Sequence, residues 1–175
     1  PCGEVSSKNV LIQYAPVLSD RWRMAVSVEN PSASYTCIPE MSEPISQRCP
    51  DIPAYVQYNP DKDSHIRVSG IFRQLSYRDM LSGRNRFVTG WGMQLSGQAL
   101  VGHGFTFYYS AAYGKGIAHY VNDLGGQGLD LIHSGNAGEL KAPGTFVFTS
   151  GLQYDFSSRF FVSASYSQCR LYGQK

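Results

Sequence analysis

The sequence predicts an all-β protein, an antiparallel transmembrane β-barrel of which about eight strands are present. Apolar and polar residues alternate with period 2 in eight segments, and short and long connections take turns between these segments. Only 16% of the 175 residues are charged, against roughly 25% in typical soluble domains. The 28 residues between Arg86 and Lys115 carry no charge, yet they are too polar for a membrane helix and divide at 101–104 into two strands.

The period-2 alternation places apolar side chains on one face of each segment and polar or small side chains on the other. In the second segment, Trp22 and Met24 alternate with Arg23 and Ala25. In chain order, the predicted strands are 10–17, 22–29, 54–59, 66–73, 86–96, 105–112, 146–155 and 160–167, of which the first and third show the weaker pattern.

The connections fall into two sizes. Four short connections contain the Asp, Gly and Ser residues that form tight turns, and they lie at 18–21, 60–64, 100–104 and 157–158. Three longer connections lie at 31–52, 78–85 and 114–144. Tight periplasmic turns at one end and long extracellular loops at the other are typical of outer-membrane barrels. We therefore expect residues 1–175 to form a single partial β-barrel domain in the bacterial outer membrane, with the three long loops extracellular.

The positions of the two chain ends bear on whether this barrel is complete. With the short turns in the periplasm, the first strand runs downward and the eighth runs upward, so both ends lie on the extracellular side. A complete bacterial barrel has both ends in the periplasm. We therefore expect an internal fragment of a larger barrel, although eight strands could also close into a narrow barrel by themselves.

Arginines lie on the polar face of the predicted strands. In a barrel whose apolar face meets lipid, this polar face lines the lumen, and charged residues lining a lumen set the selectivity of a pore. The guanidinium group binds carboxylates in bidentate fashion, so a ladder of arginines would draw anions inward. The predicted pore-lining residues are Arg23, Arg67, Arg73, Arg86 and Lys115. An equally good interpretation is that the arginines pair with Glu29, Asp155 and other acids to solvate the wall.

The long loop at 114–144 contains a helix-like spacing of apolar residues. Ile117, Tyr120, Val121 and Leu124 follow an i, i+3, i+4, i+7 pattern, which predicts a short helix. If the loop folds inward and narrows the channel, Lys115, His119 and Asp123 become constriction residues. A loop that covers the mouth or contacts a neighbouring subunit is an equally good interpretation.

Four cysteines are expected on the extracellular side, where the environment is oxidising. Cys37 and Cys49 share one predicted loop and are the first candidates for a disulfide, with Cys2 and Cys169 remaining. Three connectivities are open for four cysteines.

The remaining motifs exclude several classes of function. The sequence contains no GxSxG, HExxH or complete P-loop motif, and no Cys and His spacing typical of zinc sites, so we predict neither an enzyme nor a cofactor or metal. A net charge of +2 without a basic helix gives no reason to expect nucleic acid as a partner.

Four segments carry a resemblance to a known family. They are AVSVENP at 25–31, DIPAYVQY at 51–58, VSGIFRQL at 68–75 and, as the most specific, YGKGIAHYVNDL at 113–124. These segments resemble the DcaP-like family of trimeric outer-membrane porins. The resemblance implies a homotrimer of large barrels with roughly 16 strands each, which pass small anionic solutes, dicarboxylates among them. This chain would then cover about half of one barrel.

The predicted function is the passive diffusion of small, anionic, dicarboxylate-like solutes through an outer-membrane porin, with membrane lipid as the other partner. The alternative is a small outer-membrane barrel that does not transport and acts through its extracellular loops in binding or adhesion. The Gly, Ser and Thr residues of the polar face favour an open lumen over an interior plugged by interlocking charges.

Overall fold

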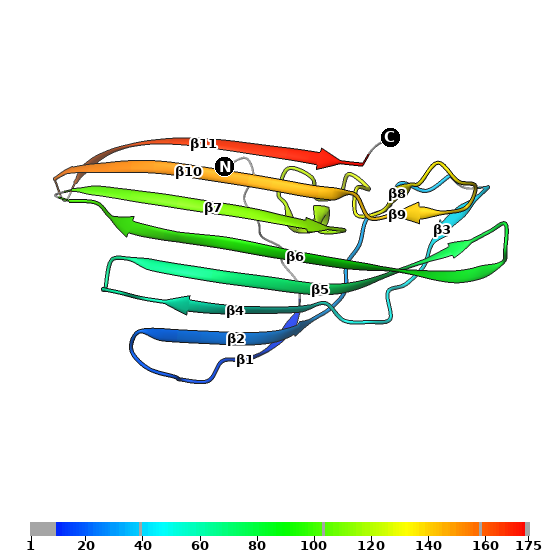
Figure 1. Cartoon of the computed structure of the whole chain (residues 1–175), viewed down its shortest axis with the longest axis horizontal. Coiled ribbons are helices and arrows are strands. Elements are labelled where there is room, and N and C mark those ends of the chain that lie inside the picture. Colours follow the sequence, from blue (N-terminus) through cyan, green and yellow to red (C-terminus); the bar gives the residue numbers. More distant parts are fainter. Residues whose placement is uncertain (1–9, 39, 103, 158, 174–175) are drawn as a thin grey trace.

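The computed structural model describes residues 10–38, 40–102, 104–157 and 159–173 and shows one continuous antiparallel sheet (Figure 1). All eight predicted segments are strands, and each pairs with its neighbour in the sequence. In sheet order they are β1 (Leu11–Tyr14), β2 (Trp22–Glu29), β4 (Ile52–Tyr58), β5 (His65–Asp79), β6 (Arg84–Leu100), β7 (Phe105–Lys115), β10 (Gly144–Ser157) and β11 (Phe160–Tyr172). Over the described residues β1 and β11 do not pair, so the sheet is open and these strands form its two edges.

The two ends of the sheet differ as the sequence predicts. The strand ends that the four predicted short connections join lie at one end, on the left of Figure 1, which we call the short-turn end, and the long connections lie at the opposite, long-loop end. The long connections contain β3 (Ser42–Pro44), which pairs with β5, a 3-10 turn η1 (Ala118–Tyr120), and a small hairpin of β8 (Ile132–His133) and β9 (Leu140–Lys141). No helix in the described part of the chain is long and apolar enough to cross a membrane.

The loop predicted at 78–85 is instead the tip of a longer hairpin. Strands β5 and β6 continue past the rest of the sheet, with Asp79 opposite Arg84, and only residues 80–83 form the turn. The Asp79 carboxylate stabilises this tip, because it accepts hydrogen bonds from the backbone N–H groups of Leu81 at 3.0 Å and Ser82 at 3.2 Å. The ends of these two strands, near Asp79 and Arg84, are rich in polar residues and do not alternate with apolar ones. The alternation pattern therefore placed the ends of both strands too early.

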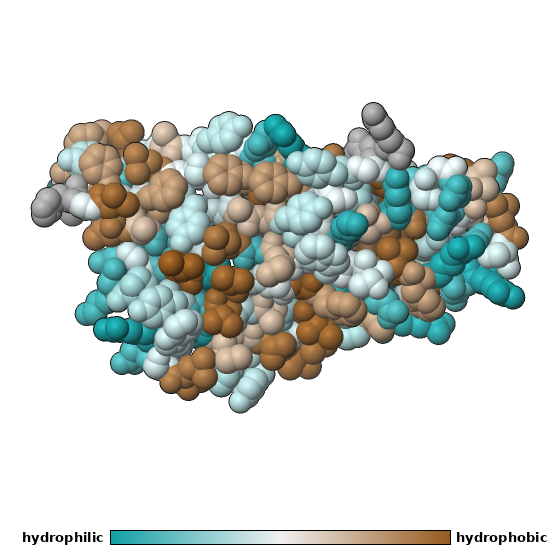
Figure 2. Space-filling view, viewed as in Figure 1, coloured by the Kyte–Doolittle hydropathy of each residue, from teal (hydrophilic) through white to brown (hydrophobic). Residues whose placement is uncertain are grey.

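One face of the sheet is apolar and exposed, and we call it the outer face. Met24 pairs with Val56, which pairs with Val68, which in turn pairs with Leu95, and all four side chains are exposed. Apolar side chains are spread over the face of the sheet turned to the viewer in Figure 2. Soluble monomers rarely expose contiguous apolar patches this extensive, whereas the lipid-facing band of a membrane barrel has this composition.

The opposite face, which we call the inner face, is polar and covered in part by loops. It carries small and polar side chains such as Ala25, Ser27, Ser69 and Gln94. Two buried clusters join the inner face to the loops. One contains Leu75, Tyr77, Leu131 and Leu140, and the other contains Ala112, Val121 and Val147. The loop at 116–143 therefore folds back onto the inner face, which answers the open question of where it lies.

Two glycines allow this close approach. A Cβ atom at Gly92 would lie 3.0 Å from Cγ2 of Ile117, and one at Gly114 would lie 3.0 Å from Cδ1 of the same residue. Because glycine has no side chain, the buried Ile117 side chain can lie directly on the backbone of β6 and β7.

Substitutions on neighbouring residues distinguish the two faces. We expect Leu95→Arg, on the outer face, to lower the free energy of unfolding of the full-length protein in lipid vesicles by about 2–4 kcal/mol, because the charge would enter lipid. Gln94→Arg places the same side chain on the inner face and is expected to cost much less. Urea titrations measure both, and equal losses would show that the outer face does not meet lipid.

Candidate functional site

Arg73 of β5 lies on the inner face and is completely buried, with 0% of its side chain exposed. Its Nε lies 3.0 Å from Oδ2 of Asp51, and its Nη1 lies 3.3 Å from Oδ1 of Asp130. Nη1 also donates to the carbonyl oxygen of Gly116 at 2.6 Å, and Nη2 donates to that of Ser32. One strand residue is thus bonded to both of the longest loops and to the start of β4.

Tyr120 of η1 completes this arrangement. Its hydroxyl donates to Oδ2 of Asp51 at 2.8 Å and lies 3.3 Å from Oε2 of Glu29. The Arg73 guanidinium lies over the Tyr120 ring, 4.9 Å from its centroid, which adds a cation–π contact. Burial raises the pKa of the Tyr120 hydroxyl, and the Asp51 carboxylate raises it further, so the phenol stays protonated and keeps donating.

Asp130 is held by backbone groups as well as by Arg73. Its Oδ1 accepts from the backbone N–H of His119 at 2.9 Å, and its Oδ2 accepts from that of Ser34 at 3.0 Å. We call Arg73, Asp51, Asp130 and Tyr120 the Arg73 network. Because its members come from β5, the start of β4, the 116–143 loop and η1, it fixes the loop against the inner face.

A second set of contacts supports the first long loop. The Tyr35 hydroxyl donates to the carbonyl oxygen of Ser76 at 3.1 Å. The Gln47 side-chain amide accepts from the Ser76 backbone N–H at 2.7 Å and donates to the same carbonyl oxygen at 3.0 Å. Tyr35 also forms β-bridges with Leu129 and Leu131, so the two long loops fold against each other.

The predicted pore-lining residues separate into three groups. Arg23 and Arg67 lie on the inner face, on the two strands that flank Gln57, and each is opposite Gln57 in the register. Both arginines line cavities. Arg86 lies on the same face near the hairpin tip, where its Nε contacts Oδ2 of Asp79 at 2.9 Å. Arg73 departs from the prediction, because its guanidinium is buried and bound to Asp51 and Asp130. It is therefore not part of the accessible lining.

Lys115 also departs from the prediction. Strand β7 runs through Lys115 instead of ending before it, and Lys115 is opposite Trp91 in the register. Trp91 and Tyr113 belong to the exposed outer row, so period 2 places Lys115 on the outer face as well. The prediction was wrong because the face of a residue depends on whether the strand reaches it.

The helix expected at 117–124 is a single 3-10 turn at Ala118–Tyr120. Ile117, Tyr120 and Val121 are nevertheless buried, so the apolar spacing marks the face of the loop that packs on the sheet. His119 and Asp123 are partly buried in this segment, and the backbone of His119 binds Asp130.

The disulfide predicted between Cys37 and Cys49 is absent, because both residues are free thiols. Cys37 packs against the cluster of Leu75 and Tyr77, whereas the Cys49 Sγ lies 2.7 Å from Oε1 of Gln74. The two thiols therefore contact different parts of the protein and not each other. Cys2, which entered the other connectivities, lies outside the described residues.

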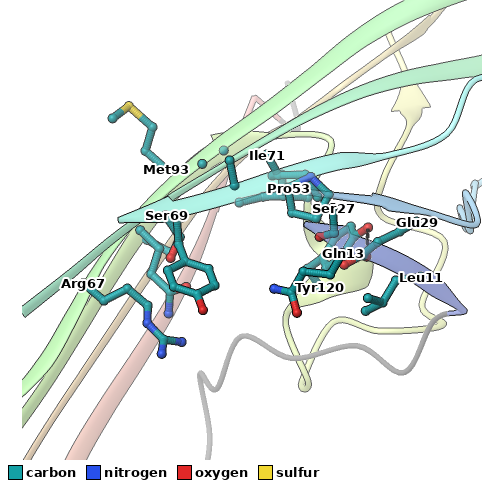
Figure 3. Close-up of a pocket in the computed structure, with 17 residues that line it drawn as sticks. Leu11, Gln13, Ser27, Glu29, Pro53, Arg67, Ser69, Ile71, Met93 and Tyr120 are labelled. Carbon is teal, nitrogen blue, oxygen red and sulfur yellow. Dashed lines mark hydrogen bonds between the residues drawn. The ribbon is translucent and has the colours of Figure 1, made fainter. Parts of the chain in front are cut away.

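Two cavities lie along the inner face. The first, of about 330 Å³, lies between the sheet and η1, and Figure 3 shows Arg67, Glu29 and Tyr120 in its lining. Arg67 is held in place there, because Nε and Nη2 donate to Oε1 of Gln57 at 2.8 and 2.5 Å and its Cζ lies 4.5 Å from the Tyr55 ring centroid. The second, of about 480 Å³, lies at the short-turn end. Its charged lining residues are Asp20, Arg21, Arg23, Asp61 and Lys62.

The sequence did not single out Asp51, Asp130 or Tyr120 as partners of Arg73. Asp130 lies 57 residues from Arg73 along the chain, so no local spacing links them. The one available signal is the position of Asp130 between Leu129 and Leu131, since a carboxylate inside an apolar segment needs a buried partner. Among the described residues, no three His, Cys, Asp or Glu side chains converge as a metal site.

Comparison with known proteins bears on the fold. No protein-family model and no curated protein matches the chain. Among solved structures, the chain is similar to the outer membrane channel DcaP of Acinetobacter baumannii, with a TM-score of 0.79 at 13% sequence identity. The alignment covers 98% of this chain and 46% of that channel, so the chain spans less than half of the channel's length. The chain therefore shares the antiparallel fold of part of that outer-membrane channel.

Substitutions in the Arg73 network are expected to have unequal effects. Arg73→Met leaves two buried carboxylates without a cation, which we expect to lower the free energy of unfolding by about 3–5 kcal/mol. Burial raises the pKa of the Asp51 carboxyl although Arg73 opposes this, so ionised Asp51 is costly to bury, and Asp51→Asn should cost only about 1 kcal/mol. Urea unfolding of the full-length protein in vesicles measures both. Equal losses would contradict this description of the network.

Proposed function

We propose that this chain forms part of the wall of a passive diffusion channel in a bacterial outer membrane. The observation that carries the proposal is the opposition of the two faces, one apolar and exposed, the other polar, hollowed by cavities and partly covered by an inward-folded loop. The fold shared with an outer membrane channel supports it. Assembly of the full-length protein as a homotrimer belongs to the same proposal and rests on the resemblance of the four sequence segments.

The solutes we propose are small anions, in particular those with carboxylate groups. Arg23 and Arg67 both lie on the inner face, one in each cavity, along the path from the short-turn end towards η1. Arginine binds carboxylate through two parallel hydrogen bonds, and rings of basic side chains favour anions in pores. Transport then needs no covalent chemistry, because solutes move down their own gradient past fixed charges.

The constriction in this channel is the segment around η1. Ile117 and Tyr120 are buried against the sheet, and both line the cavity of about 330 Å³. The Arg73 network holds this segment in place, so the width of the path at η1 depends on that network.

The selectivity of the channel depends on the lumen arginines. We expect Arg23→Ser combined with Arg67→Ser to shift the reversal potential of the full-length protein in a potassium chloride gradient towards the value for no anion preference. Lys115→Ser is the control, because it removes a cation from the outer face, whereas the double variant removes two cations from the inner face. Planar-bilayer recordings measure both, and an unchanged reversal potential in the double variant would contradict anion selection by these residues.

The conductance depends on the inward loop. Replacing residues 117–142 with a short Gly-Ser linker should raise the single-channel conductance of the full-length protein, because it removes the segment that occupies the inner face. Replacing residues 80–83, at the tip of the β5–β6 hairpin and outside the lining of both cavities, with Gly-Ser residues provides a control that should leave the conductance unchanged. An unchanged conductance after removal of 117–142 would show that the loop does not narrow the path.

A further inference from the structure

We propose that the outer face of the sheet binds the phosphate of a membrane lipid at its long-loop end, between Lys115 and Arg170. The inference rests on the proposed function, because a lipid headgroup reaches this place only if the outer face meets the membrane. The ligand class is a lipid whose headgroup is a phosphate monoester. Such a group carries a charge of about −1.5 to −2 at neutral pH and has three acceptor oxygens.

Both cations belong to the outer face, which is turned to the viewer in Figure 2. Lys115 is opposite the exposed Trp91 in the register of β6 and β7. Arg170 is opposite Phe146, and Phe146 is opposite the exposed Tyr113. Residues that are opposite one another in a sheet point to the same face. The side chains of Lys115 and Arg170 are themselves exposed, so both charges are accessible from the lipid side.

The two cations lie where the apolar row of each strand ends. Lys115 is the last residue of β7. On β11 the continuous apolar row ends at Tyr166, and Arg170 follows four residues later on the same face. Trp91 and Tyr113 are in edge-to-face contact beside them, with ring centroids 5.9 Å apart. Aromatic rings and long basic side chains at the end of an apolar band are typical of the headgroup level of a membrane.

The charges on this part of the outer face have one sign. Strands β6, β7, β10 and β11 contain a single acidic residue, Asp155, which follows Tyr154 of the outer row and therefore points to the inner face. Neither Lys115 nor Arg170 forms an ion pair with another residue of the described chain. An anion that arrives from the lipid side therefore meets two cations and no carboxylate.

The two cations are close enough to share one phosphate. Strand β10 lies between β7 and β11, and its Gly144 is opposite both Lys115 and Tyr172. Two strand spacings across the sheet and two residues along β11 place the Cα atoms of Lys115 and Arg170 about 12 Å apart. Lysine and arginine have long, flexible stems, so both charged ends can approach a phosphate above β10.

Gly144 allows a hydroxyl group to lie between the cations. A Cβ atom at Gly144 would lie 3.6 Å from the hydroxyl oxygen of Tyr113 and 3.4 Å from Cβ of Tyr172. Because glycine has no side chain, the Tyr113 hydroxyl lies over the backbone of β10. There it can donate to a phosphate oxygen and add a third donor to the site.

The Arg170 guanidinium is oriented before a lipid binds. In the orientation of the Gln168 amide that satisfies both of its polar atoms, the amide oxygen accepts from Nη2 and Nε of Arg170 at 3.0 and 3.1 Å. Nη1 and the second N–H of Nη2 then remain to donate to a phosphate. Because the side chain is already ordered, little of its freedom is lost on binding.

Charge complementarity favours a lipid over a second copy of this chain as the occupant of this face. A copy that packed through the same face would bring two more cations and no carboxylate to the contact. Like charges brought together in this way oppose association. A lipid phosphate supplies the opposite charge, and its acyl chains cover the apolar row below it.

The test measures by native mass spectrometry which lipids the full-length protein retains in detergent. The protein is mixed with equal amounts of phosphatidic acid, phosphatidylglycerol and phosphatidylcholine that have identical acyl chains. We expect it to retain phosphatidic acid, the phosphate monoester, above the other two. Lys115→Gln and Arg170→Gln should each lower this retention about fivefold. Inorganic phosphate in excess should not displace the lipid, because it lacks acyl chains.

Matched variants separate binding from folding. Arg159→Gln removes an exposed cation at the opposite end of β11 and should leave the retention of phosphatidic acid unchanged. Gly144→Val keeps every charge but displaces the Tyr113 hydroxyl, so it should lower the retention. Gly144→Ala adds only a Cβ atom at ordinary contact distances and should preserve it.

Three results would overturn the lipid site. They are equal retention of the three lipids, a preference for phosphatidic acid that survives in the Lys115→Gln, Arg170→Gln double variant, and displacement of the lipid by inorganic phosphate. Loss of the oligomer in the double variant would also overturn it and would show a protein interface at this face. The double variant should still conduct in planar bilayers, because the site lies away from the inner face. A wild-type protein that forms no channel would contradict the proposed function, whereas a conducting protein without the lipid preference would contradict this inference alone.

Discussion

The inner architecture depends on one buried guanidinium. Arg73 lies on a strand, yet its partners Asp51 and Asp130 belong to segments that are far apart in the sequence. Burying a charge is costly unless it is paired and hydrogen-bonded, and here each of the three guanidinium nitrogens has a partner in one of the loops or at the start of β4. The need to satisfy this one group therefore determines where both long loops lie.

The loops in turn shape the space on the polar face. Once Asp130 is bound to Arg73, η1 lies against β6 and β7, and Tyr120 lies beside Asp51 and Glu29. Ile117 and Tyr120 line the cavity, so the network that holds the loop also positions one wall of this cavity. The outer face makes no comparable demand on sequence, because lipid requires only apolar side chains at alternate positions.

Local rules explain what the sequence could predict. The alternation of apolar and polar residues reveals each strand by itself, because it is present within the strand whatever its neighbours are. The outer-face residues Met24 and Leu95, for example, each belong to such an alternating segment of their own strand. Arg73 and Lys115 were misplaced for reasons that period 2 does not contain. The environment of Arg73 depends on a loop that returns to the sheet, and the face of Lys115 depends on how far β7 extends. Similarly, the proximity of Cys37 and Cys49 in the sequence says nothing about which loop contacts each thiol makes.

The central claim is that the inner face borders water along a conducting path and the outer face borders lipid. Single cysteines at adjacent positions, Ser69→Cys and Val68→Cys, test it in full-length protein whose native cysteines are replaced by serine. A membrane-impermeant, charged thiol reagent should react with the cysteine at position 69 and change the single-channel current, and it should leave the cysteine at position 68 unmodified. Modification at position 68, or modification at position 69 without any change in current, would contradict the claim.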